Sequence, residues 1–429
     1  MRARMLLCGV LLGLGGCFNP TGGGGETDAT PSTSADTGGS MTGAGGSTSG
    51  APTTGGPGDG STGAAATATT DPTSETGSPG DTTAGTTGGG VVAFMPAIEV
   101  TVPGALGVIT ARLDDDGRDD LVALSSTESG GLYRILGAGL GGPAVSFATS
   151  AGTSLAGAPF NGDPFTDVVL AATDPSAIEV VRTEVDGSFA SVTPMALMPC
   201  TKPVGIALGD ADGDLNLDVA VACDGEFRYY YAAGTDGGNF AVPAQRPLNA
   251  PALQLAFADM VGDERVDLVV VNSSGLDVLP GAGGGLFDKE NQVSAQVVAP
   301  TMVAVGFVDD PFTDLVVAGG DGTCSVFYGT GDTTLGAAYE VACGTSAAFV
   351  AIGDLSGDGA PELAAVDSGE QGALVIAVNN GDGTFTESQE FAAPIGPRAL
   401  AIGDYDGVFG LDVAVAGEVG TVSVFLSAE

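Results

Sequence analysis

Short apolar runs alternate with polar turns along residues 91–429, and the same order of segments returns seven times. Each repeat has an apolar strand, an acidic loop, and an Asp or Glu that opens a second apolar strand. These closing acids, separated by 47, 51, 49, 47, 48 and 50 residues, are Asp120, Asp167, Asp218, Asp267, Asp314, Glu362 and Asp412. Short strands in units near fifty residues are typical of propeller blades. The predicted fold is all-β, a seven-bladed β-propeller.

The third repeat shows the expected blade most clearly. Residues 204–208 form its inner strand, 219–222 the second strand and 227–231 the third, with a fourth strand beginning at Phe240 after a Gly-rich turn. Similar turns precede Phe287 and Phe385. Their glycines allow positive φ, and we expect each aromatic side chain to pack between blades.

The two ends of the repeat region predict how the ring closes. The last repeat has a second strand near 413–416 and a third at 421–426, with no fourth strand after it. Residues 91–102 resemble a fourth strand, so we expect them to pair with 421–426. Such pairing hides the sheet edges that an open array would expose. A solenoid is the competing architecture, and it needs no donated strand.

The first ninety residues have a different composition. Residues 1–17 hold Arg2, Arg4 and an apolar run too short to span a bilayer, ending in Leu14-Gly15-Gly16-Cys17. This ending resembles a bacterial lipoprotein processing box, which implies that Cys17 is lipidated and becomes the mature N-terminus. Phe18 stands where an inner-membrane retention signal has Asp, so the resemblance implies an outer-membrane lipoprotein of the cell envelope. A plain signal peptide is the alternative.

Residues 18–90 are rich in Gly, Thr, Ser and Pro and, beyond Phe18, contain one large apolar side chain, Met41. A segment of this composition cannot bury enough apolar surface to offset the entropy of ordering. We expect a disordered tether of roughly 45–50 Å root-mean-square reach.

Charge and composition exclude several functions. The chain has 53 Asp and Glu against 12 Lys and Arg, a formal net charge of −41, and no His. Nucleic acid is therefore an unsuitable partner, and the membrane is expected to be reached only through the N-terminal lipid. Histidine-dependent triads and His-ligated zinc are excluded.

The acidic loop of the third repeat predicts a cation site. Asp210, Asp212, Asp214 and Asp218 occupy loop positions 1, 3, 5 and 9, and Asn216 offers its carbonyl at position 7. Four carboxylates so close together repel one another unless a hard cation lies among them. Oxygen ligands in a flexible loop favour Ca²⁺ over Zn²⁺ or Mg²⁺.

The loop spacing and its blade-length period, over residues 91–429, resemble the FG-GAP/VCBS repeats of integrin-alpha-type propellers. The resemblance implies calcium ligands in five repeats, with Leu215 at the usual turn glycine of repeat three. Arg112, Val261 and Val408 each remove one ligand from repeats one, four and seven. Beyond repeat three, the candidates are Asp354, Ser356, Asp358, Ala360 and Glu362; Asp404, Asp406 and Asp412; Asp259, Asp263 and Asp267; and Asp114, Asp116 and Asp120.

Repeats two and five differ because Pro-Phe interrupts their loops at Pro164-Phe165 and Pro311-Phe312. Proline fixes φ at the turn and the Phe can pack inward, so these loops are expected to keep their shape without metal.

Four cysteines lie in the repeat region, an even number that favours disulfides in an exported protein. Cys200 precedes the inner strand of its blade and Cys223 follows the antiparallel second strand. Cys324 begins the third strand of the fifth blade and Cys343 follows the fourth. Those ends should be neighbours, so we predict the pairs 200–223 and 324–343.

These features favour a non-catalytic, calcium-binding recognition or adhesion module, expected to be a monomer, with an unknown protein or carbohydrate ligand. An enzyme acting on polysaccharide is one alternative, since paired carboxylates can hydrolyse glycosides. A purely structural envelope component is the other. Tyr229, Tyr230 and Tyr231 are expected to pack between blades, or in part to face solvent for sugar stacking.

Overall fold

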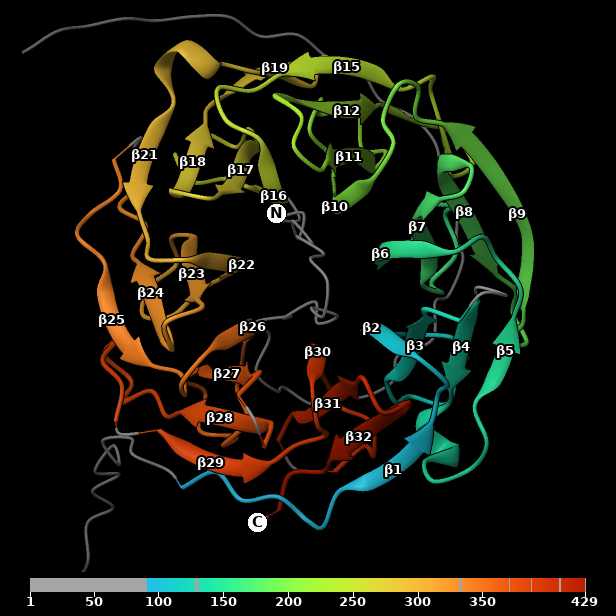
Figure 1. Cartoon of the computed structure of the whole chain (residues 1–429), viewed down its shortest axis with the longest axis vertical. Coiled ribbons are helices and arrows are strands. Elements are labelled where there is room, and N and C mark those ends of the chain that lie inside the picture. The colour runs from blue at the N-terminus through green and yellow to red at the C-terminus, as the bar shows by residue number, and fades with distance from the viewer. Residues whose placement is uncertain are drawn as a thin grey trace, which may run out of the picture. The chain divides into compact units, whose positions relative to one another are not determined.

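The computed structural model describes residues 91–127, 131–331, 334–369, 371–386, 388–408 and 410–428. The signal segment, the lipidation of Cys17 and the tether, all predicted within residues 1–90, lie outside the described residues. Within the described part, seven four-stranded antiparallel sheets surround a central axis (Figure 1). The predicted seven-bladed β-propeller is confirmed.

The first three blades are regular apart from one added hairpin, β13 (Gly234–Thr235) with β14 (Asn239–Phe240). Their strands, from the axis outward, are β2 (Ala105–Ala111), β3 (Asp120–Ser125), β4 (Leu132–Ile135) and β5 (Val145–Phe147); β6 (Gly152–Ala158), β7 (Asp167–Thr173), β8 (Ser176–Thr183) and β9 (Phe189–Ala196); β10 (Pro203–Gly209), β11 (Asp218–Cys223), β12 (Arg228–Ala232) and β15 (Ala244–Pro247).

The fourth blade has a similar added hairpin, β19 (Gly281–Gly283) with β20 (Leu286–Phe287). Two 3₁₀ turns, η1 (Gly137–Gly139) and η2 (Lys289–Asn291), lie between third and fourth strands. The strands of blades 4 to 6 are β16 (Ala252–Ala258), β17 (Asp267–Asn272), β18 (Gly275–Leu279) and β21 (Val293–Gln296); β22 (Pro300–Gly306), β23 (Asp314–Gly319), β24 (Thr323–Phe327) and β25 (Tyr339–Ala342); β26 (Ala347–Gly353), β27 (Glu362–Asp367), β28 (Ala373–Ala377) and β29 (Gln389–Ala392).

The seventh blade joins the two ends of the repeat region. It contains β30 (Pro397–Gly403), β31 (Asp412–Gly417) and β32 (Thr421–Phe425), and its outer strand is β1 (Ile98–Thr101). Strand β1 runs antiparallel to β32, with Ile98 opposite Val424 and Thr101 opposite Thr421. The pairing continues where the amide of Ala428 donates to the carbonyl of Ala93 at 2.9 Å. The predicted closure is confirmed, and the solenoid alternative is wrong.

The two added hairpins correct one expectation about blade 3. Phe240 was predicted to begin the fourth strand, but it belongs to β14, and the fourth strand starts at Ala244. The Gly-rich turn forms its own small hairpin because its glycines adopt positive φ, as at Gly237 and Gly238.

Aromatic side chains pack between neighbouring blades, as predicted. The ring of Phe287 stacks on Phe257 at 5.6 Å and meets Tyr229 of the preceding blade at 6.4 Å. Tyr229, Tyr230 and Tyr231 are only 2%, 1% and 5% exposed. The packing interpretation of the tyrosine cluster is therefore right, and the sugar-stacking interpretation is wrong.

Both predicted disulfides are present. Cys200 bonds to Cys223, joining the segment before β10 to the end of β11, and Cys324 bonds to Cys343 across β24 and β25. Disulfides of this kind are typical of proteins that fold in an oxidising, extracytoplasmic compartment. No helix in the described ranges is long and apolar enough to cross a membrane.

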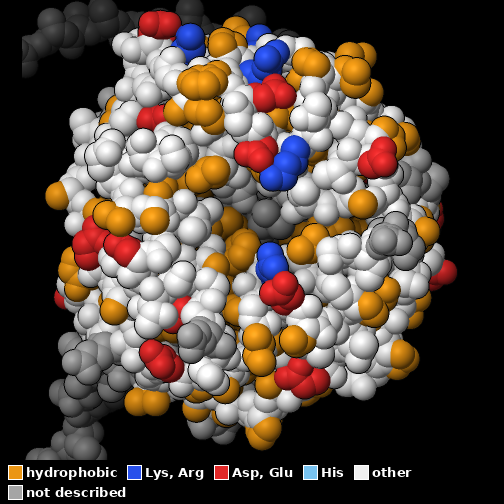
Figure 2. Space-filling model, viewed as in Figure 1, with side chains coloured by type: hydrophobic (Ala, Val, Ile, Leu, Met, Phe, Trp, Pro, Cys, Tyr) orange, Lys and Arg blue, Asp and Glu red, His pale blue; other side chains and the backbone are white. Residues whose placement is uncertain are grey.

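The face of the propeller in Figure 2 carries scattered hydrophobic side chains, some of them around the central opening, and rather few charges. Several of the charges on the molecule are paired, as in Lys202 with Asp224 at 2.7 Å and Arg398 with Glu418 at 3.0 Å. Such exposed pairs contribute little to stability, so the sheets and the core between them hold the ring together.

Candidate metal centres

Each acidic loop connects the first and second strands of its blade, so the seven loops lie at the same end of the ring. They are numbered here by blade, loop 1 to loop 7. Every closing acid is the first residue of a second strand and is at most 1% exposed. Burial raises the pKa of Glu362 to about 7 and that of the others to about 6, namely Asp120, Asp167, Asp218, Asp267, Asp314 and Asp412.

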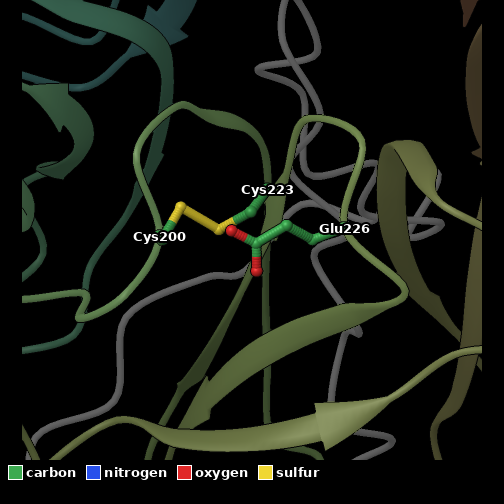
Figure 3. A group of neighbouring side chains, drawn as sticks. All are labelled: Cys200, Cys223 and Glu226. Carbon is green, nitrogen blue, oxygen red and sulfur yellow. A yellow bond between two sulfur atoms is a disulfide. The ribbon is translucent and has the colours of Figure 1, made fainter.

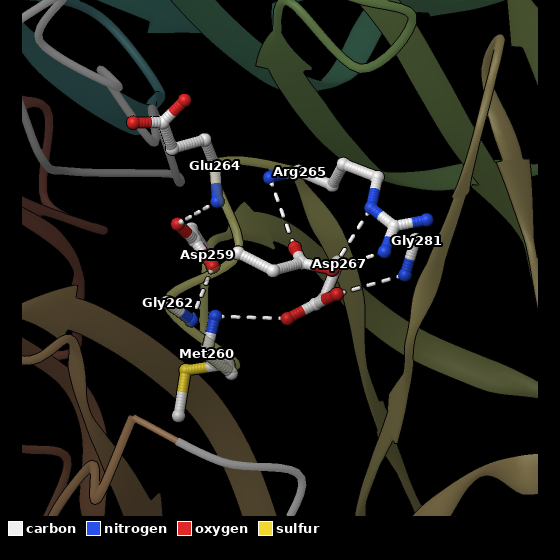
Figure 4. A network of polar contacts seen from close by, with 8 residues as sticks. Asp259, Met260, Gly262, Glu264, Arg265, Asp267 and Gly281 are labelled. Atoms are coloured by element: carbon white, nitrogen blue, oxygen red, sulfur yellow. Dashed lines mark hydrogen bonds and ion pairs between the residues drawn. The ribbon is translucent and has the colours of Figure 1, made fainter. Parts of the chain in front are cut away.

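The closing acid fastens its blade together through main-chain donors. In loop 3, Asp218 Oδ2 accepts from the amides of Ala211 at 2.9 Å and Asp212 at 3.1 Å, and Oδ1 accepts from Gly234 after the third strand at 2.7 Å. Asp267 does the same with Met260 and Gly281, both at 2.8 Å (Figure 4). A buried carboxylate is tolerated where several N–H groups satisfy it.

In blades 1, 3, 4 and 5 a glycine that sequence reasoning missed faces this acid, whereas Thr183 and Ser427 donate to it in blades 2 and 7. A Cβ on Gly281 would strike the carbonyl of Val266, and the same holds for Gly234 against Leu217. Only glycine allows the main chain this approach. Its signal is a glycine 14 to 16 residues after the closing acid, as at Gly281 and Gly234.

Loop 3 brings three of its five predicted ligands together. Oxygen atoms of Asp210, Asp212 and Asp218 all lie within 4.8 Å of one another. Burial and the nearby Asp214 raise the pKa of Asp212. Asp214 is not in this group; it accepts from the Asn216 amide at 2.8 Å and side chain at 3.0 Å, which lowers its pKa. Leu215 has φ of 75°, the conformation that the missing turn glycine would supply.

Loop 7 gathers all three of its predicted ligands, Asp404, Asp406 and Asp412, within the same 4.8 Å. Loop 5 gathers Asp309, Asp310 and Asp314 equally closely, although its Pro-Phe sequence led us to expect a metal-free turn. The expected inward packing is also wrong there, because Phe312 is 42% exposed.

Loop 6 shows a different signal. Its carboxylates are not among the closely gathered groups of the described residues, and Asp358 and Ala360 bond to each other at the turn. Yet Asp354 Oδ1, Ser356 Oγ and Glu362 Oε1 are buried without a hydrogen-bond partner. These are predicted ligand residues at positions 1, 3 and 9. Buried oxygens are seldom left unpaired, since the loss costs about 1–3 kcal/mol for each group.

In loop 4 an arginine pairs with one of the predicted ligands (Figure 4). The guanidinium of Arg265 contacts Asp263 through Nε at 2.8 Å and Nη2 at 2.5 Å. Asp259 accepts from the amides of Gly262 and Glu264 at 2.7 and 3.1 Å. The three predicted ligands, Asp259, Asp263 and Asp267, are not gathered into a group.

Loop 1 is also neutralised from within, because Arg112 forms an ion pair with Asp115. Asp114 accepts from the amide of Asp116 at 3.0 Å, and Asp116 accepts from that of Arg118 at 2.9 Å. Together with Asp120 they are predicted ligands that the structure leaves apart.

Loop 2 is held by hydrogen bonds within its own turn. Phe165 is 5% exposed, and Asn161 and Asp163 accept from main-chain amides of the turn at 2.9 Å. The Phe of the Pro-Phe pair therefore packs inward in loop 2 and not in loop 5.

Main-chain bonds join successive loops around the closure. The first residue of a loop accepts from the residue just before the closing acid of the next blade. The bonds are Leu411 to Asp354 at 3.2 Å, Asp119 to Asp404 at 2.8 Å, and Thr166 to Arg112 at 2.8 Å. Loops 6, 7, 1 and 2 are thereby held in fixed register across the closing blade.

Cys200, Cys223 and Glu226 also lie close together (Figure 3). Their sulfurs are bonded to each other, so no thiolate is available as a ligand. Glu226 lies 2.9 Å from the guanidinium Nε of Arg228. This group is structural.

The fold and its loops define a seven-bladed β-propeller with repeated acidic turns. More particularly, the chain carries FG-GAP-like repeats: residues 160–221 and 354–407 match the family model of the FG-GAP-like repeat. A comparison with curated proteins finds no match.

Solved structures share the fold at low identity. BBS1N, in complex with ARL6DN and soaked with mercury, is 12% identical with a TM-score of 0.55, covering 79% of this chain and 98% of its own. The lead-soaked form of that complex is equally similar, with 78% and 97% covered. An Agrocybe aegerita lectin that recognises non-reducing terminal N-acetylglucosamine is 16% identical, with a TM-score of 0.50 and coverage of 72% and 85%.

Proposed function

We propose that this chain is a calcium-stabilised, non-catalytic recognition module, held at the cell envelope by a lipid on Cys17. The FG-GAP propeller fold is compatible with ligand recognition, and the disulfides agree with export. The lipoprotein box and the tether-like composition of residues 18–90 support anchoring at the outer membrane.

The unpaired oxygens of loop 6 carry the calcium proposal. Asp354, Ser356 and Glu362 each keep a buried oxygen without a hydrogen-bond partner, although the other carboxylate oxygens of Asp354 and Glu362 accept from main-chain amides. A bound cation would satisfy these atoms, because the lone pairs of an oxygen that receives no hydrogen bond can coordinate a metal ion instead.

Loop 3 supports the same proposal through charge. Asp210, Asp212 and Asp218 would each hold the cation through one oxygen. The ligand atoms are all oxygen, which suits Ca²⁺, and the buried carboxylates supply no nitrogen or sulfur for Zn²⁺. Once bound, the ion supplies positive charge that relieves the repulsion between these carboxylates.

Metal analysis of the full mature chain, after dialysis with Ca²⁺ present, tests this proposal. We expect at least two equivalents of calcium per chain, one in loop 3 and one in loop 6. The D212N and S356A variants should each lose about one equivalent, whereas D263N in the arginine-filled loop 4 should lose none. Retention of full calcium content by D212N and S356A would contradict the assignment.

The lipid anchor has a separate test. The wild-type chain expressed in a Gram-negative host should fractionate with outer membranes and incorporate labelled fatty acid. The C17S variant should do neither. Equal fatty-acid incorporation by C17S would show that Cys17 is not the modified residue.

A further inference from the structure

We propose that a polar hollow on blade 4 binds a neutral sugar. The hollow has a volume of about 220 Å³ and is open to solvent. Its walls come from the segment after β15, the hairpin between β17 and β18, and the outer strand β21. Pockets for drug-sized ligands measure about 300–1,000 Å³, so this one suits a ligand of about one sugar ring. The inference rests on the proposed recognition function and deepens it.

Five side chains of these walls form one continuous hydrogen-bonded network. Asn249 Nδ2 donates to Gln292 Oε1 at 2.8 Å, and Gln292 Nε2 donates to Ser294 Oγ at 3.2 Å. Ser294 Oγ donates to Asp277 Oδ1, and Asn272 Nδ2 donates to Asp277 Oδ2 at 2.8 Å. Bonds between side chains make up only about 10–15% of protein hydrogen bonds, so a run of four across three segments is unusual.

The inner end of this network is buried and fixed. Asn272 is 5% exposed and Asp277 is 8% exposed. Asn272 Oδ1 also accepts from the amide of Ser274 at 2.9 Å, which sets the orientation of its side chain. Fully satisfied polar networks are rigid, so the lining is arranged before any ligand arrives.

The chemistry of the lining selects the ligand class. Amides and hydroxyls both donate and accept, as sugar hydroxyls do, and the carboxylate accepts, with a further lone pair on each oxygen. Neither Lys nor Arg is among the described residues that line the hollow, and the protein carries a net charge of −41, so an anionic ligand is disfavoured. One carboxylate is too few for a calcium site. Ala250 lines the hollow beside Asn249 and offers a small apolar surface to the C–H groups of a ring.

Blade 2 provides a matched control. Glu179 is also a buried carboxylate on a third strand, 3% exposed, and it accepts from the amide of Ser150 at 3.1 Å and from its hydroxyl. Glu179 does not line the hollow. The variants D277N and E179Q thus remove the same kind of buried charge, and only one of them changes the proposed site.

Titration of the full mature chain with methyl glycosides of glucose, galactose, mannose and N-acetylglucosamine, followed by ligand-observed NMR, tests the inference. Wild type and E179Q should bind at least one of them. D277N should bind it ~10-fold more weakly or worse, the loss expected for a hydrogen bond to a carboxylate. The N249A variant, which changes an exposed residue, provides a second measurement of sugar affinity if D277N fails to fold. It should weaken binding severalfold.

Two results overturn the inference. One is equal sugar affinity in wild type, D277N and N249A, which places the sugar elsewhere and leaves the recognition function standing. The other is the absence of binding by any of the four glycosides. Calcium content measured on the same samples shows separately whether the proposed calcium function has failed.

Discussion

Loops 3 and 4 begin from nearly the same sequence pattern and reach different ends. Both have Asp at positions 1, 5 and 9, and both have a non-glycine residue with positive φ at position 6, Leu215 and Glu264. In loop 3 the carboxylates face one another, whereas in loop 4 the Arg265 guanidinium takes Asp263 for itself. The three gathered carboxylates of loop 3 are at positions 1, 3 and 9, and loop 4 has Val261 at position 3. Acidic spacing therefore builds the turn, while the residue at position 3 and the ion pair of Arg265 separate the two loops.

The largest effect should come from the closing acids, which both loops share. In the presence of a chelator, D218A and D267A should each destabilise the chain by about 3 kcal/mol or more, because two or three buried N–H groups lose their acceptor. Equilibrium denaturation measures the change. A loss of less than 1 kcal/mol in either variant would show that the carboxylate does not fasten its blade.

The second effect separates the loops. With saturating Ca²⁺, D212N should lower the free energy of unfolding by about 2.7 kcal/mol, the contribution of one site at a hundredfold excess over its dissociation constant. D263N should cost less than about 1 kcal/mol, as exposed ion pairs do. Chelator should abolish the D212N effect and leave the D263N effect unchanged. The reverse pattern would contradict the comparison.

Removing the arginine should make the calcium response of loop 4 more like that of loop 3. The R265M variant keeps the length of the side chain but frees Asp263 from its ion pair. Without calcium the variant should be less stable by about 1 kcal/mol, and added calcium should restore that loss. Thermal melts of R265M and wild type with and without calcium decide the matter. An equal calcium response in both would mean that Arg265 does not stand in for the ion.

The smallest effect concerns the backbone at position 6. Leu215 is 66% exposed and has positive φ, which costs roughly 1–2 kcal/mol for a side-chain-bearing residue. L215G should therefore stabilise the chain by up to about 1 kcal/mol after the entropy of the unfolded glycine is included. Destabilisation by L215G would show that the Leu side chain makes contacts that outweigh this strain.

The blades could be predicted from the sequence because each unit repeats its own local signals. The closing acids, the strand runs and the separation of cysteines along antiparallel strands are all visible in one unit, so the ring, the pairing of residues 98–101 with the last strand and both disulfides followed. These features depend on the order of short segments, which can be read directly from the sequence.

The state of each loop could not be predicted in the same way, because it depends on where single side chains turn. Asp214 accepts from the amide of Asn216 and lies outside the gathered carboxylates of loop 3. Asp309 and Asp310 lie close to Asp314, although the Pro-Phe sequence of loop 5 predicted a turn without metal. The hydrogen-bonded network that links Asn249 to Asn272 through Asp277 was also missed, since its members come from three segments without a common motif.

The central claim is that calcium stabilises this propeller through its acidic loops, and a thermal melt of the full mature chain tests it most directly. Millimolar Ca²⁺ should raise the melting temperature by roughly 5–10 °C over chelator for one occupied site, at 2–4 °C per kcal/mol. Equal Mg²⁺ should raise it far less. Identical melting temperatures in Ca²⁺, Mg²⁺ and chelator would contradict the account.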